Sequence, residues 1–246
     1  MGPPPPMSFE ATITSIHQMT PEVKQFVVRA DEEFEYEPGQ HTTVQFDPEE
    51  AGIDAEEDGD VVRPYTATNL PGTNAITLAI KRYDEGTASV YMHERDTDDT
   101  ITLGDLSGNL TLRDTDEDVV FVSTGTGITP IIPMLRQYVE EGTGEIHFFY
   151  GEKTQENIMY RETIDALDAQ NENLSVVYSL SDEDWDGPTG HVQEHIEEYI
   201  EDLDDRRYYT CGVPQMVVDT KERLDELGVP DDHVVSEGWE DGAVED

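Results

Sequence analysis

The sequence predicts two domains, an antiparallel β-barrel or sandwich followed by an α/β domain on a parallel sheet. Between Phe9 and about Leu112, short runs of alternating apolar and polar residues are separated by turn residues. After the acidic stretch 114–118, apolar strands and amphipathic helices alternate four times, which is typical of a covered parallel sheet. We therefore assign the barrel to residues 9–113 and the α/β domain to residues 118–240, with tails at 1–8 and 241–246.

In the first domain the pattern predicts six strands and one helix. The strands are expected within residues 9–19, 24–30, 37–46, 61–69, 75–83 and 100–106. Short strands at this spacing, with Pro-Gly turns between them, favour an antiparallel barrel or sandwich. The helix is expected at 88–95, A-S-V-Y-M-H-E-R, directly after D-E-G-T, residues 84–87.

In the second domain each expected strand leads into a helix. Strands are expected at 118–124, 145–151, 174–181 and 206–212, and helices at 131–142, 157–170, 191–203 and 214–228. The segment V-P-D-D-H-V-V-S-E-G-W, residues 229–239, closes the domain. No apolar run approaches the roughly 18 residues of a membrane span.

The composition indicates a folded core under an acidic surface. The chain has 57 acidic and 14 basic residues, a formal net charge of −43, and 35% hydrophobic residues. This field disfavours nucleic acid and anionic membranes as partners. Surface acid with only four lysines is similar to the style of salt-adapted archaea, in which high salt screens the self-repulsion. We expect a halophilic archaeal origin, a cytoplasmic protein and a monomer.

Cysteine and histidine usage points away from metal chemistry. Cys211 is the only cysteine, which excludes internal disulfides and a cysteine-ligated iron–sulfur cluster within the chain. His191 and His195 are four residues apart on an expected helix, but without a third ligand they favour a solvated helical face. We expect no metal site.

Three stretches are candidates for binding anions, and each has a plainer interpretation. The turn S-T-G-T-G-I-T-P, residues 123–130, joins a strand to a helix and suits a phosphate, although Pro130 stands where a third glycine is usual. Arg63 follows an acidic stretch and could hold a phosphate bidentately, or simply balance surface acids. Residues 84–89 open a helix whose free N–H groups could accept an anion, while Thr87 could instead be an N-cap.

Seven motifs in order give the chain a resemblance to the ferredoxin–NADP reductase family. They are R-P-Y-T, K-R-x-x-x-G-T-A-S, G-D-L-S-G-N-L, G-T-G-I-T-P, Y-G-E-K-T-x-E-N-I-M-Y-R-E, C-G-V-P-Q-M and V-V-S-E-G-W, from about Phe9 to Trp239. The resemblance implies an FAD-binding barrel, a domain for NADH or NADPH, and hydride transfer between nicotinamide and flavin. One departure is Val213, where the family often has a second proline.

The resemblance also implies roles for individual residues. Thr66, Cys211 and Glu237 would act at the reacting ends of the cofactors, with Thr66 near flavin N5 and Cys211 near nicotinamide C4. A sole cysteine would by itself favour a small buried hydrophobe, and it is the following Gly-Val-Pro, residues 212–214, that points to the site. Trp239 would cover the flavin, although seven residues follow it. The remaining cofactor-binding positions are Arg63, Pro64, Tyr65, Ile80, Lys81, Gly86, Thr87, Ala88 and Ser89 for FAD, and Gly125, Thr126, Gly127, Pro130, Gly212 and Pro214 for the dinucleotide.

Coenzyme choice and acceptor follow less directly. NADPH-selective members place a serine and an arginine after the third strand of the nucleotide domain, but this chain has S-L-S-D-E at 179–183. Asp182 would repel a 2′-phosphate and could bond a ribose hydroxyl instead, so NADH is favoured, with Lys153 and Arg161 as the cations that could reverse this. We expect a separate acceptor of ferredoxin or flavodoxin type. The alternatives are a flavin-carrying subunit of a larger complex and a flavin-free acidic interaction protein.

Overall fold

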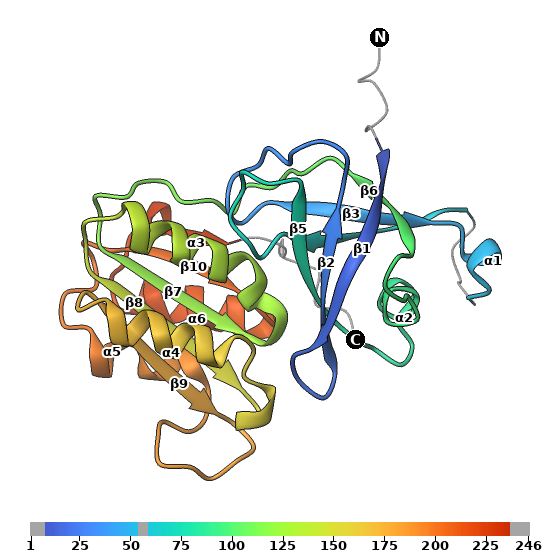
Figure 1. The fold of residues 1–246 in the computed structure, drawn as a ribbon. Helices are drawn as coiled ribbons and strands as arrows, with labels where there is room; N and C mark the ends of the chain where they lie inside the picture. Colours follow the sequence, from blue (N-terminus) through green and yellow to red (C-terminus); the bar gives the residue numbers. More distant parts are fainter. Residues whose placement is uncertain (1–7, 54–58, 237–246) are drawn as a thin grey trace. The chain divides into compact units, whose positions relative to one another are not determined.

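The computed structural model describes residues 8–53 and 59–236 and divides the chain into two compact units between Thr111 and Leu112. Figure 1 shows an all-antiparallel sheet in the first unit and a helix-covered sheet in the second. The predicted fold class, a β-barrel followed by a parallel-sheet α/β domain, is confirmed. Each unit is described by itself below.

The first unit is a six-stranded antiparallel sheet in the order β4-β3-β6-β1-β2-β5. An isolated bridge between Ala67 and Leu78 joins the segment after β4 to β5, so the two ends of this order meet. The strands are β1 (Ser8–Gln18), β2 (Val23–Arg29), β3 (His41–Phe46), β4 (Val61–Thr66), β5 (Ala75–Lys81) and β6 (Thr100–Gly104), with the short helices α1 (Pro48–Ala51) and α2 (Thr87–His93).

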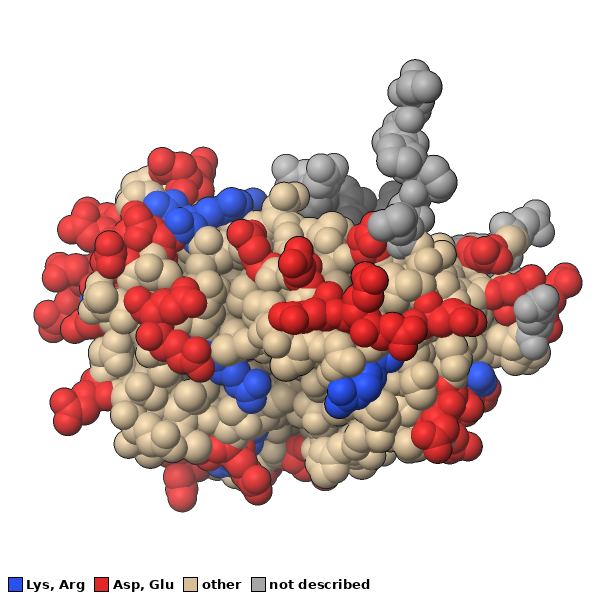
Figure 2. All heavy atoms as spheres, turned by 45° about the horizontal axis from the view of Figure 1, so that its top comes forward, with Lys and Arg blue, Asp and Glu red and all other residues tan. Residues whose placement is uncertain are grey.

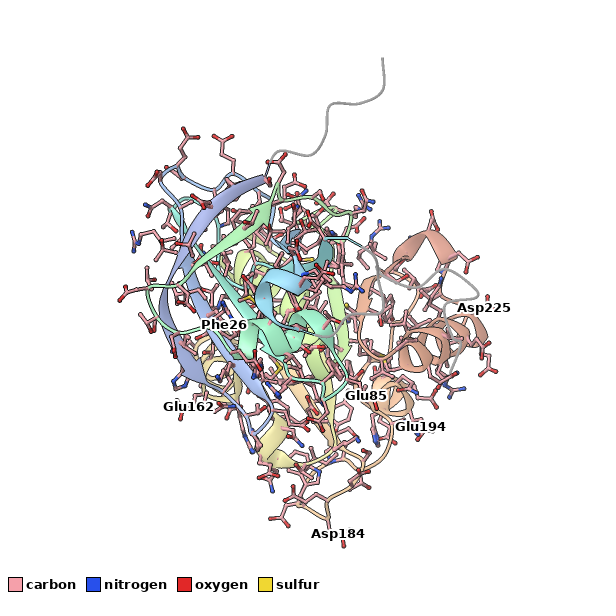
Figure 3. The ribbon with its side chains drawn as sticks, turned by 90° about the vertical axis from the view of Figure 1, so that its right-hand side faces the viewer. Phe26, Glu85, Glu162, Asp184, Glu194 and Asp225 are labelled. Atoms are coloured by element: carbon pink, nitrogen blue, oxygen red, sulfur yellow. The ribbon has the colours of Figure 1, made fainter. Side chains whose placement is uncertain are left out.

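Alternation along these strands places one apolar core inside the first unit. In β3, Thr42, Val44 and Phe46 are buried while the residues between them are half-buried. Phe26 of β2 is fully buried, and Figure 3 shows it among the strands. Burying a side chain of this size contributes about 1.5–3 kcal/mol. The period of two that predicted the strands therefore also separates core from surface.

The second unit is a five-stranded parallel sheet in the order β11-β10-β7-β8-β9. Its elements are β7 (Val119–Thr124), η1 (Gly125–Gly127), α3 (Ile128–Glu141), β8 (Ile146–Glu152), η2 (Gln155–Asn157), α4 (Arg161–Gln170), β9 (Leu174–Leu180), η3 (Val192–His195), α5 (Ile196–Tyr199), β10 (Arg207–Cys211), α6 (Pro214–Glu226), η4 (Asp231–His233) and β11 (Val234–Ser236). The strand β11 was not expected. The helix expected over 191–203 is shorter, consisting of η3 and α5.

Helices cover both faces of this sheet. On one face, Val120, Val122 and Phe149 pack with residues of η3, α5 and α6 in a single buried cluster. On the other face α3 packs against β7 and β10, and α4 against β9 (Figure 1). Sequence runs such as D-V-V-F-V-S are apolar on both sides because both sides are covered.

Within the part of the chain that the structure describes, no helix has the length and apolar character needed to cross a membrane.

Candidate functional site

The first candidate residues lie on β4 and follow its antiparallel pairing with β3. Arg63 pairs with Val44, Tyr65 with Thr42, and Thr66 with His41. The Arg63 side chain is half-buried, and its Nη1 donates to the carbonyl oxygen of Val62 at 3.0 Å. Pro64, which has no N–H to donate, is exposed between these residues. Because side chains alternate along a strand, Arg63 and Tyr65 lie on one face of β4.

The environment of Tyr65 keeps its hydroxyl protonated. Burial raises the pKa of Tyr65 to about 12, although the Arg63 guanidinium opposes the rise and Tyr83 adds to it. Arg63 and Tyr83 are therefore each close enough to Tyr65 to interact with it electrostatically. A cation beside an aromatic ring suits a ligand that combines a phosphate with a ring system.

Helix α2 is fixed to the barrel by three contacts that involve two of its residues, Tyr91 and His93. Tyr91 stacks on Phe46 of β3, with ring centroids 3.9 Å apart and an interplanar angle of 4°. The ring Nε2 of His93 lies 2.8 Å from the Ile80 carbonyl, and Lys24 Nζ donates to the His93 carbonyl at 2.9 Å. Burial lowers the pKa of His93, so the neutral ring donates to this carbonyl at neutral pH. The C-terminal end of α2 is thereby held beside the end of β5.

The start of α2 is formed by backbone, since no side chain caps it. Gly86 is the N-cap and makes no side-chain capping hydrogen bond, so the N-cap expected from Thr87 is wrong. Ser89 Oγ instead accepts the Tyr83 N–H at 3.2 Å, and a Cβ at Gly86 would meet that Oγ at 2.4 Å. The close approach of the loop to the helix requires glycine at this position.

Other predicted FAD positions differ in what they present to a ligand. The side chains of Ile80 and Ala88 are buried in the core cluster, so only their backbones can face a ligand. Lys81 Nζ is 3.0 Å from Glu22 Oε2 and 5.8 Å from the centroid of the Tyr83 ring. Lys81 also lines an open hollow of about 370 Å³. The other residues lining it are Pro21, Glu22, Arg82, Tyr83, Asp84 and His93.

In the second unit the glycine turn after β7 has one open and one closed position. Gly125 has φ +56° and no atom within 4 Å of a built Cβ, so its outer side is open. A Cβ on Gly127 would lie 2.2 Å from the Cys211 carbonyl oxygen. Thr129 Oγ1 donates to the Thr126 carbonyl at 2.9 Å, and Pro130 is buried in the first turn of α3. The turn therefore presents backbone at the start of a 14-residue helix, which favours a phosphate.

The segment Cys211–Pro214 forms a second helix start next to this turn. Cys211 pairs with Ser123 in the β10–β7 ladder, and the Val213 N–H donates to Thr124 Oγ1 at 3.1 Å. Gly212 lies against Thr124, where a Cβ would be 2.4 Å from Oγ1. Pro214 begins α6. The structure thus brings the predicted dinucleotide residues of both motifs together at the carboxyl ends of β7 and β10.

Asp182 lies farther along the same sheet edge, after β9. Its side chain is exposed and accepts a hydrogen bond from Ser181 Oγ at 3.0 Å, and its N–H donates to the Lys153 carbonyl at 3.0 Å. The neighbouring Glu183 accepts from both the backbone and the side-chain N–H of Gln155, at 2.7 and 2.8 Å. These two bonds lower the pKa of Glu183. The connections after β8 and β9 are therefore tied together by an acidic residue.

Arg161, one of the two cations considered for a 2′-phosphate, is already engaged. Its Nη1 donates to Gln155 Oε1 at 3.2 Å, its Nε is 3.8 Å from Asp165, and its guanidinium lies 5.8 Å from the Tyr178 ring centroid. Lys153 is exposed. Carboxylates thus outnumber available cations at this edge of the sheet.

His191 and His195 are not arranged as metal ligands in the part of the chain that the structure describes. His191 is exposed, and the His195 ring lies within 3.2 Å of Glu198 Oε2 and 3.0 Å of the Thr189 carbonyl. In residues 8–53 and 59–236, no group of three potential ligands is placed to hold a metal ion. Glu237 and Trp239 fall outside the described residues.

Sequence reasoning missed two residues beside the glycine turn. Tyr150 and Glu152, near the end of β8, join the turn through the Tyr150 hydroxyl, which lies 3.2 Å from the Gly125 carbonyl oxygen and 3.0 Å from Glu152 Oε1. A tyrosine within an apolar strand predicts only core packing. The signal that could have identified Glu152 is an acid at the end of the strand next to a glycine-rich turn.

Each unit matches a known domain family. Residues 10–110 match the oxidoreductase FAD-binding domain and residues 121–222 the oxidoreductase NAD-binding domain. The donor sets described above fit these cofactors, because each offers a helix start with bare backbone and the first adds a half-buried arginine.

Relatives extend over nearly the whole chain. Ferredoxin–NADP reductase B of Sorangium cellulosum is 29% identical over 247 residues, covering 94% of this chain and 98% of its own length. The reductase component of the naphthalene 1,2-dioxygenase system of Pseudomonas putida is 26% identical over 245 residues, covering 98% and 71%. The FAD/NAD-binding domain of a nitric oxide dioxygenase from Vibrio cholerae superposes with a TM-score of 0.84 at 21% identity, covering 94% and 98%. With an FAD-binding unit followed by an NAD-binding unit, the chain belongs to the ferredoxin–NADP reductase family of oxidoreductases.

Proposed function

We propose that the protein is an FAD-dependent reductase that takes hydride from NADH and passes electrons to a separate acceptor of ferredoxin or flavodoxin type. One observation carries the proposal. The glycine turn after β7 packs on the Cys211 carbonyl, so two helix starts meet at one sheet edge with open backbone facing outward. Such an edge suits a dinucleotide.

In the first unit, the FAD pyrophosphate would be held by Arg63 and by the N–H groups at the start of α2. An arginine fork and a helix start together offer donors for two phosphate charges. Tyr65 would pack beside the flavin ring, and Thr66 would hydrogen-bond near N5. Bound FAD supplies the conversion of a two-electron donor into single-electron steps.

In the second unit, the chain's own residues bind and orient the coenzyme. The turn Gly125–Gly127 would hold the pyrophosphate, and Cys211 on the neighbouring strand would lie beside the nicotinamide. Hydride transfer needs the donor and acceptor atoms in contact with water excluded, so orientation is the main contribution of the protein. Glu237 and Trp239, which lie outside the described residues, are proposed at the same reacting end by family resemblance.

Asp182 supports NADH over NADPH as the coenzyme. An exposed carboxylate at the end of β9 would repel a 2′-phosphate, and Arg161 is engaged by Gln155, Asp165 and Tyr178. A free-standing reductase is our first choice. The relative named as a reductase component of a dioxygenase system keeps open a flavin-carrying subunit with little activity of its own.

The acidic surface supports work in a salt-rich cytoplasm, such as that of a halophilic archaeon. Figure 2 shows acidic side chains spread over the visible face with few basic ones between them. Repulsion between this surface and an acidic ferredoxin would be screened within about 3 Å at 1 M salt. We propose that the protein acts there as a monomer.

An absorption spectrum in molar KCl with added FAD tests the flavin assignment first. We expect flavin bands that stay with the protein through desalting into the same salt, and reduction of an artificial dye with NADH as donor. A colourless protein would contradict the proposal. Bound flavin without dye reduction would instead favour the subunit alternative, and a large kcat/KM preference for NADPH would overturn the coenzyme assignment.

A further inference from the structure

Tyr150 is a fully buried tyrosine whose hydroxyl lies between the turn after β7, the end of β8 and the connection from β8 to α4. Its oxygen lies 3.2 Å from the Gly125 carbonyl oxygen, 3.0 Å from Glu152 Oε1 and 3.4 Å from the Met159 nitrogen. The Met159 N–H donates to the hydroxyl, which in turn donates to an oxygen of Glu152 or Gly125. Burial, and then Glu152, raise the pKa of Tyr150 well above its usual value, so it remains a donor.

Glu152 is held beside the glycine turn by the register of the sheet. Thr124 pairs with Gly151 in the β7–β8 ladder, which puts Glu152 at the level of Gly125 on the neighbouring strand. Its carboxylate accepts from the Tyr150 hydroxyl at one oxygen and from the Lys153 N–H at the other, at 3.3 Å. The Tyr150 hydroxyl and the Lys153 N–H thus hold the Glu152 carboxylate in place. Without such donors, the negative charge of a nearby pyrophosphate would repel it.

Strand order gives this acid a direction relative to Cys211. Because β7 lies between β10 and β8, Cys211 is on one side of the turn and Glu152 on the other. A dinucleotide with its pyrophosphate on the turn and its nicotinamide toward Cys211 must extend its adenosine half toward β8. In βαβ dinucleotide sites, an acid at the end of the second strand bonds the ribose hydroxyls.

We propose that Glu152 binds the adenosine ribose hydroxyls of NADH and that Tyr150 positions it. This inference deepens the proposed function and rests on it. Glu152 is nearer to the turn than Asp182, because β9 is one strand spacing, roughly 4.8 Å, beyond β8. In this arrangement Glu152 contacts the ribose, while Asp182 repels a phosphate attached to the 2′-oxygen of that ribose.

Calorimetric binding of ADP-ribose and of 2′-phospho-ADP-ribose to the FAD-loaded protein in 2 M KCl tests the assignment without turnover. Glu152→Gln keeps the side-chain shape and an acceptor for Tyr150 but removes the charge. We expect its Kd for ADP-ribose to rise about tenfold, the loss of one charge-assisted hydrogen bond. We also expect its discrimination against the 2′-phosphorylated ligand to shrink, because the repelling charge is gone.

Two further variants separate positioning from a general charge effect. Tyr150→Phe should weaken ADP-ribose binding in the same direction but less, and should raise the KM for NADH more than it lowers kcat. Glu156→Gln removes an equal charge from an exposed residue of the same connection and should bind both ligands as the parent does.

The binding results distinguish a failure of the Glu152 assignment from a failure of the proposed reductase function. Glu152 is not the ribose ligand if the parent discriminates between the two ligands and Glu152→Gln binds both of them as the parent does. If weaker ADP-ribose binding is seen only in Asp182→Asn, the ribose ligand is the acid after β9. An equal loss in Glu156→Gln would reduce the effect to overall charge. If the FAD-loaded parent binds neither ligand, the proposed function itself fails.

Discussion

At the residue scale, Arg63 offers the sharpest test of the flavin site. Arg63→Ala removes the charged fork proposed to hold the pyrophosphate, and charge-assisted hydrogen bonds contribute about 1.5–3 kcal/mol, so we expect FAD affinity to fall about 10- to 100-fold. Arg63→Lys keeps the charge but not the planar fork and should lie between. Fluorescence titration of FAD in 2 M KCl measures all three proteins.

A matched cation in the same unit controls for charge. Arg29 on β2 donates from Nη1 to Asn74 Oδ1 at 2.7 Å and has no assigned ligand role, so Arg29→Gln should bind FAD as the parent does. Unchanged FAD affinity in Arg63→Ala, with circular dichroism like that of the parent, would remove Arg63 from the site.

Residues differ in how far the sequence alone reveals them. Arg63 is conspicuous because cations are rare in this chain. Gly125 and Gly127 are conspicuous because glycine between a strand and a helix allows a tight turn and a close approach of the backbone to a ligand. Tyr150 gives no such signal, because a tyrosine within a buried apolar strand is expected only to pack in the core. Its role depends on which carbonyl the strand register brings to its hydroxyl.

At the element scale, the turn after β7 makes a prediction that contrasts two glycines. Gly127→Ala puts a methyl group 2.2 Å from the Cys211 carbonyl oxygen, which is backbone and cannot move aside cheaply. We expect a loss of about 3 kcal/mol or more, at the upper end for overpacking. Gly125→Ala meets open space and has only the left-handed φ of +56° against it, about 1 kcal/mol.

Thermal unfolding in 2 M KCl compares the two variants. At roughly 3 °C for each kcal/mol in a chain of this length, Gly125→Ala should lower Tm by a few degrees and Gly127→Ala by about three times as much. Equal Tm values would mean that the turn does not pack tightly on β10.

Elements with a clear period were predictable, and the departures have physical causes. The expected helix over 191–203 carries Glu194, Glu197, Glu198 and Glu201, and like charges three and four residues apart destabilise helical turns. Only the pieces whose Val192 and Ile196 reach the core, η3 and α5, form there. The strand β11 is three residues long, too short for any periodicity, and exists because β10 offers an edge to pair with.

At the scale of the whole molecule, charge dominates the expected response to salt. Among the described residues no Asp or Glu is buried, so the acids repel one another through solvent, where ions can screen them. We expect Tm to rise by several degrees between 0.1 M and 2 M KCl, as screening shortens from about 10 Å to below 3 Å. A Tm that is the same at both concentrations would contradict a salt-adapted surface.

A charge-reduced variant separates screening from general salt effects. Glu162, Asp184, Glu194 and Asp225 lie on the outside of the second unit, as Figure 3 shows, and all are exposed. Replacing them together by Gln or Asn should stabilise the protein in dilute buffer and flatten its salt dependence. If the variant keeps the parent's full salt dependence, the rise of Tm with KCl comes from strengthened hydrophobic packing and not from screening of charges.

An interior without carboxylates has a practical consequence for redesign. Because none of the described acidic side chains helps to fill the core, the outer shell and the packed interior can be recoded separately. Lysines and amides introduced across the exterior would lower the negative charge of the reductase without changing its core. Comparing electron acceptors with such a variant would then show how much of the choice of partner comes from the charge of the outer shell.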